Sequence, residues 1–333
     1  MKTTFAALVL MFGMMASMVG QEQGIPAPAQ PKPDSPEVVA HTQAAQKAAG
    51  TAWKAAADFF CSPAANRANR PDDPLLPATR IFDNLYVIGR AGTAVFAVST
   101  SEGVVLIDAG YADQLESVLL SGLRDAGLDE ANVKYILLGH GHADHYGGAA
   151  YFQQKHGTRI AMAGADWDLV ENPPAPRGRG APAAAAAAPK RDVVLSDGQV
   201  LTVGDQKFTI VAIPGHTAGS VGVIFPVKEG RVTHTAGLFG GTILIPGRIS
   251  DASLQEYLRS IERFGTVART MNVDIEIQNH PLYDNITEKV MAVRAGKKGG
   301  DHPFVVGKDA YQRFLTVQAE CMRAQMARRS AGS

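Results

Sequence analysis

The chain is poor in cysteine and in charged residues, and each shortage narrows what it can be. It has only two cysteines, Cys61 and Cys321, and neither lies in a ligand-like motif, so a metal site would have to use other residue types. Charged residues make up 19% of the chain, and the formal net charge is zero. Since no basic patch with interleaved aromatic residues stands out, we expect no nucleic-acid partner.

The N-terminal apolar stretch is shorter than the about 20 residues that a membrane-spanning helix needs. This stretch, residues 5–19, follows a basic start at Lys2 and precedes small residues. The pattern is typical of a secretory signal peptide, which we place at residues 1–20; an uncleaved anchor or a buried helix is the alternative. We therefore expect a periplasmic or secreted protein with no stable membrane partner.

Export would place the two cysteines in an oxidising compartment, where thiols can pair. Cys61 follows an alanine-rich helical segment at residues 44–60, and Cys321 lies in the last predicted helix. One hypothesis is a disulfide that ties an N-terminal arm to the C-terminal helix. Two buried free thiols are the alternative, because pairing does not follow from sequence alone.

Composition divides the chain into segments. Residues 21–41 are rich in Pro, Gln and Ala and are predicted to be a disordered linker. A helical arm is expected over residues 42–77, and a single catalytic domain over residues 78–333, where a hydrophobic content of 46% for the whole chain supports a large core. Residues 172–190, rich in Pro and Ala, are predicted to be a surface insertion, with a lid as the alternative.

Hydrophobic periodicity predicts an alternation of strand runs and helices. Strands are expected near residues 85–90, 94–99, 103–107, 133–138, 159–162, 192–202, 207–212, 220–226, 231–237 and 273–277. Helices are expected near residues 42–60, 112–127, 164–170, 252–264, 285–296 and 308–328. Runs of strands followed by helices suit an α/β fold in which two sheets pack face to face with helices outside.

The most informative segment reads His-Gly-His-Ala-Asp-His at residues 140–145, directly after an apolar strand. In a near-extended loop, side chains two positions apart point the same way, so His140 and His142 can share one ion. His145, next to Asp144, points away from that pair. Catalytic zinc takes three protein ligands and keeps a position for water, so two ions would need two further ligands.

Two other histidines occupy similar positions. His216 and His280 each follow a predicted strand and lie in loops rich in Gly or Pro. Given the cluster at residues 140–145, they become the candidates for the missing ligands. The four remaining histidines are interpreted as ordinary surface or core residues; they are His41, His156, His234 and His302.

These motifs together resemble the metallo-β-lactamase superfamily: His-x-His-x-Asp-His, then Pro-Gly-His-Thr-x-Gly-Ser, then a late His-Pro. The resemblance covers residues 78–330, and its C-terminal part is similar to the subclass that binds two zinc ions with His and Asp only. It implies a four-layer αββα sandwich. By position it implies a first zinc held by His140, His142 and His216, a second held by Asp144, His145 and His280, and Asp108 as a residue that orients ligands.

One segment lacks a residue that many hydrolases of this family have. Those hydrolases place a metal-bridging Asp in a Gly-Asp-Thr sequence. Here residues 237–244 contain no carboxylate, and none follows before Asp251. Thr242 stands where a related subclass has a cysteine ligand, and a neutral hydroxyl is a poor zinc ligand beside a thiolate. Thr242 and Arg248 are therefore the candidates for binding the substrate.

The resemblance implies an enzyme in which hydroxide from a zinc-bound water attacks a carbonyl carbon, with Asp144 orienting the hydroxide. The leading interpretation is an exported zinc hydrolase that opens the β-lactam rings of small-molecule antibiotics and so confers resistance. A related hydrolase of lactones or other cyclic esters and amides is the first alternative. A zinc-binding protein with a degenerate pocket and an iron-binding redox member are the others, and the oligomeric state is left open.

Overall fold

The computed structural model describes residues 33–62, 73–173, 187–244, 249–296 and 302–332, and Asp34–Ser333 form one compact unit. The predicted signal peptide, residues 21–32 of the predicted linker, most of the 172–190 insertion and Arg248 lie outside the described residues. Among the helices that are described, none has the length and hydropathy of a membrane span.

The first sheet follows the chain from edge to edge. Its order is β1 (Leu75–Phe82), β2 (Leu85–Arg90), β3 (Ala94–Thr100), β4 (Gly103–Ile107), β5 (Val133–Leu137), β6 (Arg159–Ala163) and β7 (Val193–Leu195). The strands from β1 to β4 pair antiparallel, whereas those from β4 to β7 pair parallel. The parallel strands therefore end at one edge of the sheet, where their loops meet.

Helical segments connect these parallel strands. A 3-10 turn (Ala112–Gln114), a π-helical segment (Leu115–Leu120) and α3 (Ser121–Asp125) replace the single helix predicted near residues 112–127. A further 3-10 turn (Glu130–Asn132) precedes β5. The later connections contain α4 (Ala143–Tyr146), α5 (Ala149–His156) and α6 (Gly164–Glu171).

The second sheet has the order β12 (Ile275–Ile277), β11 (Val232–Phe239), β10 (Val221–Glu229), β9 (Gln206–Ala212) and β8 (Val200–Val203). Its pairs are antiparallel except β11 with β12, which are parallel and joined through α7 (Asp251–Thr270). After β12 come a 3-10 turn (Pro281–Tyr283), α8 (Ile286–Arg294) and α9 (Lys308–Gly332).

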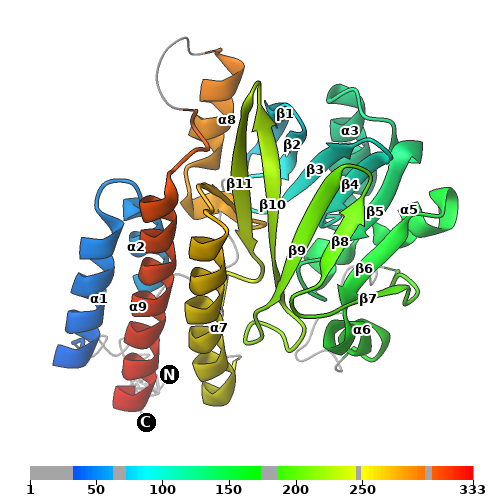
Figure 1. Ribbon diagram of the computed structural model, residues 1–333. Coiled ribbons are helices and arrows are strands. Elements are labelled where there is room, and N and C mark those ends of the chain that lie inside the picture. The colour runs from blue at the N-terminus through cyan, green and yellow to red at the C-terminus, as the bar shows by residue number, and fades with distance from the viewer. Residues whose placement is uncertain (1–32, 63–72, 174–186, 245–248, 297–301, 333) are drawn as a thin grey trace, which may run out of the picture. The chain divides into compact units, whose positions relative to one another are not determined.

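The two sheets pack face to face with helices on both outer sides (Figure 1). Alternate residues of β3 show why: Phe96 joins the core between the sheets, whereas Val95 joins the core under the helices. Phe208 and Phe225 of the second sheet lie in the same central core, with ring centroids 5.4 Å apart. The predicted four-layer αββα sandwich is confirmed.

The N-terminal arm differs from its prediction. Its first helix, α1 (Pro36–Ala49), begins within the segment predicted to be a disordered linker, because Ser35 caps it through a hydrogen bond from the Val38 amide and proline suits its first turn. Gly50, in a left-handed conformation that favours glycine, ends α1, and α2 (Lys54–Cys61) follows. The single helix predicted near residues 42–60 is thus two helices.

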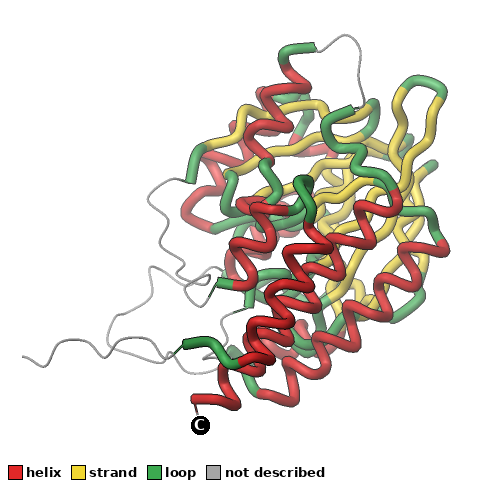
Figure 2. Tube along the Cα trace, turned by 90° about the vertical axis from the view of Figure 1, so that its left-hand side faces the viewer, coloured by secondary structure: helices red, strands yellow, loops and turns green. Residues whose placement is uncertain are grey.

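The arm packs along α9, and Figure 1 shows α1 and α2 beside it. Figure 2, seen from that side, shows helices lying in front of the strands. A disulfide joins Cys61 at the end of α2 to Cys321 in α9, with an S–S distance of 2.01 Å. The hypothesis of a tie between the arm and the C-terminal helix is confirmed.

One predicted strand is wrong as a single element. The segment near residues 192–202 is split into β7, which pairs with β6 in the first sheet, and β8, which pairs with β9 in the second. The chain changes sheets at a turn in which the Ser196 carbonyl accepts a hydrogen bond from the Gln199 amide. Sequence periodicity does not register that turn, because both halves of the segment have strand-like residues.

Candidate metal centre

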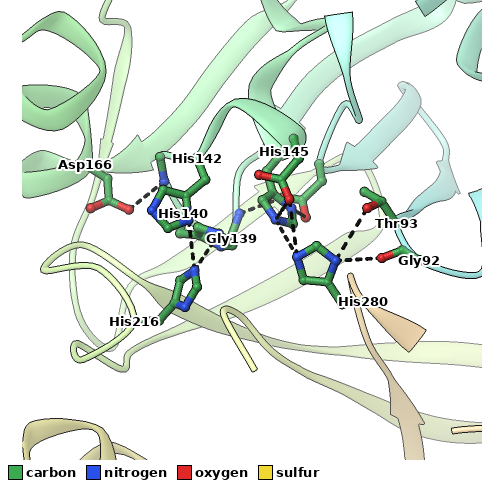
Figure 3. Close-up of polar contacts among 12 residues, drawn as sticks. Gly92, Thr93, Gly139, His140, His142, His145, Asp166, His216 and His280 are labelled. Carbon is green, nitrogen blue, oxygen red and sulfur yellow. Dashed lines mark hydrogen bonds and ion pairs between the residues drawn. The ribbon is translucent and has the colours of Figure 1, made fainter. Parts of the chain in front are cut away.

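The site lies where strands of both sheets end. The loops after β4 and β5 carry Asp108 and the run of residues 140–145, and the loops after β9 and β12 carry His216 and His280. Figure 3 shows the five histidines of these loops converging from separate segments of the chain. The structure brings all six predicted ligands together, in two groups of three whose candidate ligand atoms lie within 4.8 Å of one another.

The first group consists of imidazoles only. His216 Nε2 lies 3.0 Å from His140 Nε2 and 3.0 Å from His142 Nδ1. Burial, together with the neighbouring histidines, lowers the pKa of His140 and of His216 well below the usual range. Both rings are therefore neutral near pH 7, with nitrogen lone pairs that a cation between them would stabilise.

The second group combines a carboxylate with two imidazoles. His145 Nε2 lies 3.1 Å from His280 Nε2 and 3.3 Å from Asp144 Oδ2. Burial alone would lower the pKa of His145, but the carboxylates of Asp144 and Asp108 outweigh it and raise the pKa to about 10. Burial also opposes ionisation of Asp144, yet the histidines around it hold the pKa of this carboxyl below its ordinary value.

Asp108 orients the second group by contacting the ring nitrogen of His145 that does not face His280. Its Oδ2 lies 2.7 Å from His145 Nδ1, and its Oδ1 accepts a hydrogen bond of 2.9 Å from the Gly139 amide. The residue is fully buried and has φ = 66°, a left-handed conformation that is uncommon for a residue other than glycine. Such strain persists where the surroundings enforce it, which is common at functional sites. Here the carboxylate reaches both the ligand and the loop that carries it.

His280 is oriented in a similar way by the backbone. Its Nδ1 lies 2.7 Å from the Gly92 carbonyl oxygen and 3.5 Å from Thr93 Oγ1 (Figure 3). A histidine that donates a hydrogen bond from one ring nitrogen in this manner presents its other nitrogen, here Nε2, as a metal ligand. Burial, with His145 nearby, lowers the pKa of His280 to about 4, so the ring is neutral near pH 7.

Asp166 is a residue of the site that sequence reasoning missed. It lies fully buried in the first turn of α6 and accepts hydrogen bonds from the Gly141 amide (2.7 Å), the Thr217 hydroxyl (2.7 Å) and the Gly219 amide (2.9 Å). The position of Asp166 in the order of elements does offer a signal for its role. It follows β6, which is the parallel neighbour of β5, and loops at the ends of neighbouring parallel strands meet.

The two residues predicted to bind the substrate, Thr242 and Arg248, do not lie among the converging side chains that the structure describes. Thr242 is only 2% exposed, and its Oγ1 accepts a hydrogen bond of 2.5 Å from the Tyr283 hydroxyl. The Thr242 side chain is therefore buried against Tyr283 and is not open to a substrate in this structure, so a contact with substrate stays a prediction. Arg248 lies outside the described residues.

The other histidines have ordinary environments. His41 contacts Glu320 at 2.7 Å, His156 contacts Glu130 at 3.3 Å, and His234 contacts Asp274 at 2.7 Å. His302 stacks on Phe82, with ring centroids 4.1 Å apart. Within the described ranges, only the two groups above bring three or more His, Cys, Asp or Glu side chains close enough together to hold a metal ion.

The donors fit a divalent transition metal. Three nitrogens in one group, and two nitrogens with one carboxylate in the other, are ligand sets that zinc accepts in catalytic sites. An oxygen-only site would instead favour magnesium or calcium. The arrangement can thus hold a metal ion, and it leaves 23% of the Asp144 side chain exposed.

Comparison with known proteins identifies related sequences. A model of the Metallo-beta-lactamase superfamily matches residues 88–265. The chain is 32% identical over 165 residues to the hydroxyacylglutathione hydrolase GloC of Haemophilus influenzae, covering 48% of this chain and 74% of that protein. It is 30% identical over 191 residues to the acyl-coenzyme A thioesterase MBLAC2 of Bos taurus, covering 51% and 66%. It spans only 30% of a hydroxyacylglutathione hydrolase of Acidiphilium cryptum, at 33% identity over 27% of this chain.

Solved structures give a fuller match. BJP-1, a subclass B3 metallo-β-lactamase of Bradyrhizobium japonicum, superposes with a TM-score of 0.66 at 25% identity, covering 78% of this chain and 97% of that chain. The native FEZ-1 metallo-β-lactamase of Legionella gormanii shares the fold, with a TM-score of 0.65 at 20% identity over 79% of this chain and 100% of that chain. The resemblance that the motifs indicated is confirmed.

Proposed function

Since this chain belongs to the metallo-β-lactamase superfamily, whose members of known activity include the hydrolases it matches, we propose that it is an exported hydrolase that uses two zinc ions to open β-lactam rings. The observation that carries the proposal is the division of six side chains into two groups of three. Each group has the number and type of ligands that catalytic zinc takes.

Each of the two groups of residues would hold one metal ion. His140, His142 and His216 would hold the first ion, and Asp144, His145 and His280 the second. Bound zinc supplies a Lewis acid and lowers the pKa of water towards neutrality. The chain offers no Gly-x-Ser-x-Gly elbow that would supply a serine nucleophile in its place.

Asp144 has a second task in this proposal. Its carboxylate is ionised at neutral pH, and about a quarter of the side chain is exposed, which sets it apart from the fully buried His145 beside it. An exposed, ionised oxygen can accept a hydrogen bond from a water molecule and hold it towards a bound carbonyl carbon. Asp144 would therefore orient the attacking water as well as hold metal.

The choice of a β-lactam substrate rests on two features. The described residues 237–244 contain no carboxylate, in contrast to hydrolases that place a metal-bridging aspartate in a Gly-Asp-Thr sequence. The ligand set also matches the His/Asp-only pattern of the subclass to which BJP-1 is assigned. A β-lactam is a strained cyclic amide, so attack on its carbonyl needs no protein nucleophile.

A second candidate is hydrolysis of thioesters or lactones by the same two groups. It is favoured by the curated relatives, which are named as hydroxyacylglutathione hydrolases and an acyl-coenzyme A thioesterase. The burial of Thr242 also favours it, because this side chain is not free to bind the carboxylate that β-lactam antibiotics carry.

Export is supported by two independent features. The first is the basic start and short apolar stretch at residues 1–20. The second is the disulfide between Cys61 and Cys321, since such bonds persist in oxidising compartments such as the periplasm. An exported β-lactamase would protect its host from β-lactam antibiotics.

The test is a hydrolysis assay on zinc-loaded protein that begins after residue 20. A chromogenic cephalosporin, an acyl-glutathione thioester and an acyl-homoserine lactone are compared, each with and without a chelator. We expect cephalosporin turnover with kcat/KM of about 10⁴ M⁻¹s⁻¹ or more, lost on chelation and restored by zinc. Chelator-sensitive turnover of the thioester or lactone alone would replace the first candidate with the second. No turnover of any substrate by the zinc-loaded protein would contradict both.

A further inference from the structure

We propose that Asp166 is a positioning residue that holds the two loops of the first ligand group at the spacing a metal ion requires. This inference rests on the proposed zinc function, because it assigns Asp166 a task in metal binding and not only in folding. The loops are residues 139–142, which carry His140 and His142, and residues 215–220, which carry His216.

The first group needs such a residue because its buried rings have no outer partner. His140 Nδ1 and His216 Nδ1 are buried and have no hydrogen-bond partner among the described residues. In the second group, by contrast, the Nδ1 atoms of His145 and His280 face Asp108 and the Gly92 carbonyl. Ligand histidines are normally held by contacts of that kind. In the first group the backbone has to fix the rings instead.

Asp166 acts on the backbone of both loops at once. Its Oδ2 accepts from the Gly141 amide, which lies between His140 and His142, and from the hydroxyl of Thr217, next to His216. Its Oδ1 accepts from the Gly219 amide in the same second loop. One buried carboxylate thus joins two segments more than 70 residues apart, and hydrogen bonds to a charged acceptor are the strong kind.

Two glycines make this close approach possible. A Cβ atom added at Gly219 would lie 2.6 Å from the Asp166 amide nitrogen and 2.7 Å from its Cγ. A Cβ at Gly141 would lie 3.0 Å from the Asp166 carbonyl oxygen. The glycines in His-Gly-His and in Thr-Ala-Gly-Ser therefore have a shared reason, which is room for Asp166.

Asp108 fixes the first loop at a second point. The Gly139 amide donates to Asp108 and the Gly141 amide donates to Asp166, so the backbone on both sides of His140 is fixed by a buried carboxylate. His140 itself is fully buried. The position of its ring then follows from the two anchored peptide groups without a side-chain partner.

The experiment compares Asp166→Asn with Asp168→Asn in a background that carries His280→Ala and so leaves only the first group intact. Asn keeps the shape but offers one acceptor oxygen in place of two, and its amide faces N–H donors. Asp168 lies on the same helix and pairs on the surface with Arg191, so it serves as the matched control. Zinc affinity is measured by competition with a chromophoric chelator.

We expect Asp166→Asn to weaken zinc binding by about 10–100-fold, the range for outer contacts of metal ligands, and Asp168→Asn to leave it unchanged. In metal-free protein, the Gly141 and Gly219 amides should exchange hydrogen faster in Asp166→Asn. Thr217→Val, which removes one of the three hydrogen bonds, should give a smaller loss of affinity and serves if Asp166→Asn does not fold.

Two results would overturn the inference. One is wild-type zinc affinity in both Asp166→Asn and Thr217→Val. The other is an equal loss of affinity at the second group, measured in a His142→Ala background, because Asp166 would then support only the general fold. If the unsubstituted protein binds no zinc, the proposed function fails and the metal-positioning role fails with it. Normal zinc binding with no effect of Asp166 refutes this inference alone.

Discussion

The two ligand groups lie at one edge of the sandwich, yet they are held in different ways. In the second group, a carboxylate and a carbonyl contact the outer nitrogens of His145 and His280. In the first group, the described residues offer no such contact to His140 or His216, and Asp166 holds the loops instead. The second group is thus oriented through its side chains and the first through its backbone.

The difference also appears in protonation. In the metal-free protein, Asp144 and Asp108 raise the pKa of His145 to about 10, despite its burial, so this ring is charged at neutral pH. Burial keeps His140 and His216 neutral. One edge of the sandwich thus brings together two candidate metal-binding groups of different charge, since carboxylates contact the histidine rings of only one of them.

The largest expected effect is loss of hydrolysis when either group loses a ligand. His142→Ala and Asp144→Ala should each lower kcat/KM by more than about 100-fold, because changes in outer contacts alone cost up to that much. Circular dichroism should show an unchanged fold. His156→Ala is the control, since His156 contacts Glu130 away from both groups. If one of the two variants kept full turnover, its group would not take part in catalysis.

A smaller effect is expected from Asp108→Asn, the counterpart of Asp166→Asn in the second group. The substitution removes the charge that faces His145 Nδ1, so zinc affinity of the second group should fall by about 10–100-fold, measured in a His142→Ala background. Affinity of the first group should fall less, since Asp108 reaches it only through the Gly139 amide. Equal losses in both groups would show that Asp108 does not hold the second group in particular.

The smallest expected effect concerns a buried cluster of charged side chains from the segments that flank His280 in the sequence. Lys289 Nζ lies 3.6 Å from Glu276 and 3.5 Å from Asp284, and both carboxyl groups are buried. Burial, reinforced by Asp284 and opposed by Lys289, raises the pKa of Glu276 to about 8. Tyr283 and Tyr311 are the other titratable neighbours, and burial keeps their hydroxyls protonated.

The raised pKa of Glu276 determines whether stability rises or falls with pH. Between its ordinary value of 4.5 and about 8, the folded chain holds a proton on Glu276 that the unfolded chain has lost, so stability falls as pH rises through this window. Glu276→Gln should flatten the fall and raise the melting temperature at pH 9 by about 2–4 °C relative to wild type. Thermal melting at pH 5 and pH 9 measures it, and an unchanged pH dependence would show that Glu276 titrates normally.

The sequence predicts well which six side chains come together and predicts their surroundings poorly, for a physical reason. The ligands lie in short motifs at strand ends, where their chemistry and local backbone direction are encoded within a few residues. The task of Asp166 depends on β6 lying beside β5 and on Gly219, which comes 53 residues later, so no local pattern reports it. The burial of Thr242 likewise depends on Tyr283, which is distant in the chain.

The elements of the fold that the sequence predicts, and those that it misses, differ for a similar physical reason. Long periodic segments such as α7 and β9 are predicted because each buries one regular face. The break between β7 and β8 is missed, because it depends on which sheet offers each half a partner. The start of α1 is missed for the opposite reason: proline-rich composition outweighs the single capping contact of Ser35.

The central claim is that the chain holds two separate metal ions, one in each group. The most direct measurement is the number of zinc ions bound per chain, by mass spectrometry under native conditions, in wild type, His142→Ala and His280→Ala. We expect two ions in wild type and one in each variant, with the remaining ion in the group that was not changed. One ion in wild type that is lost in both variants would mean a single shared site and would contradict the central claim.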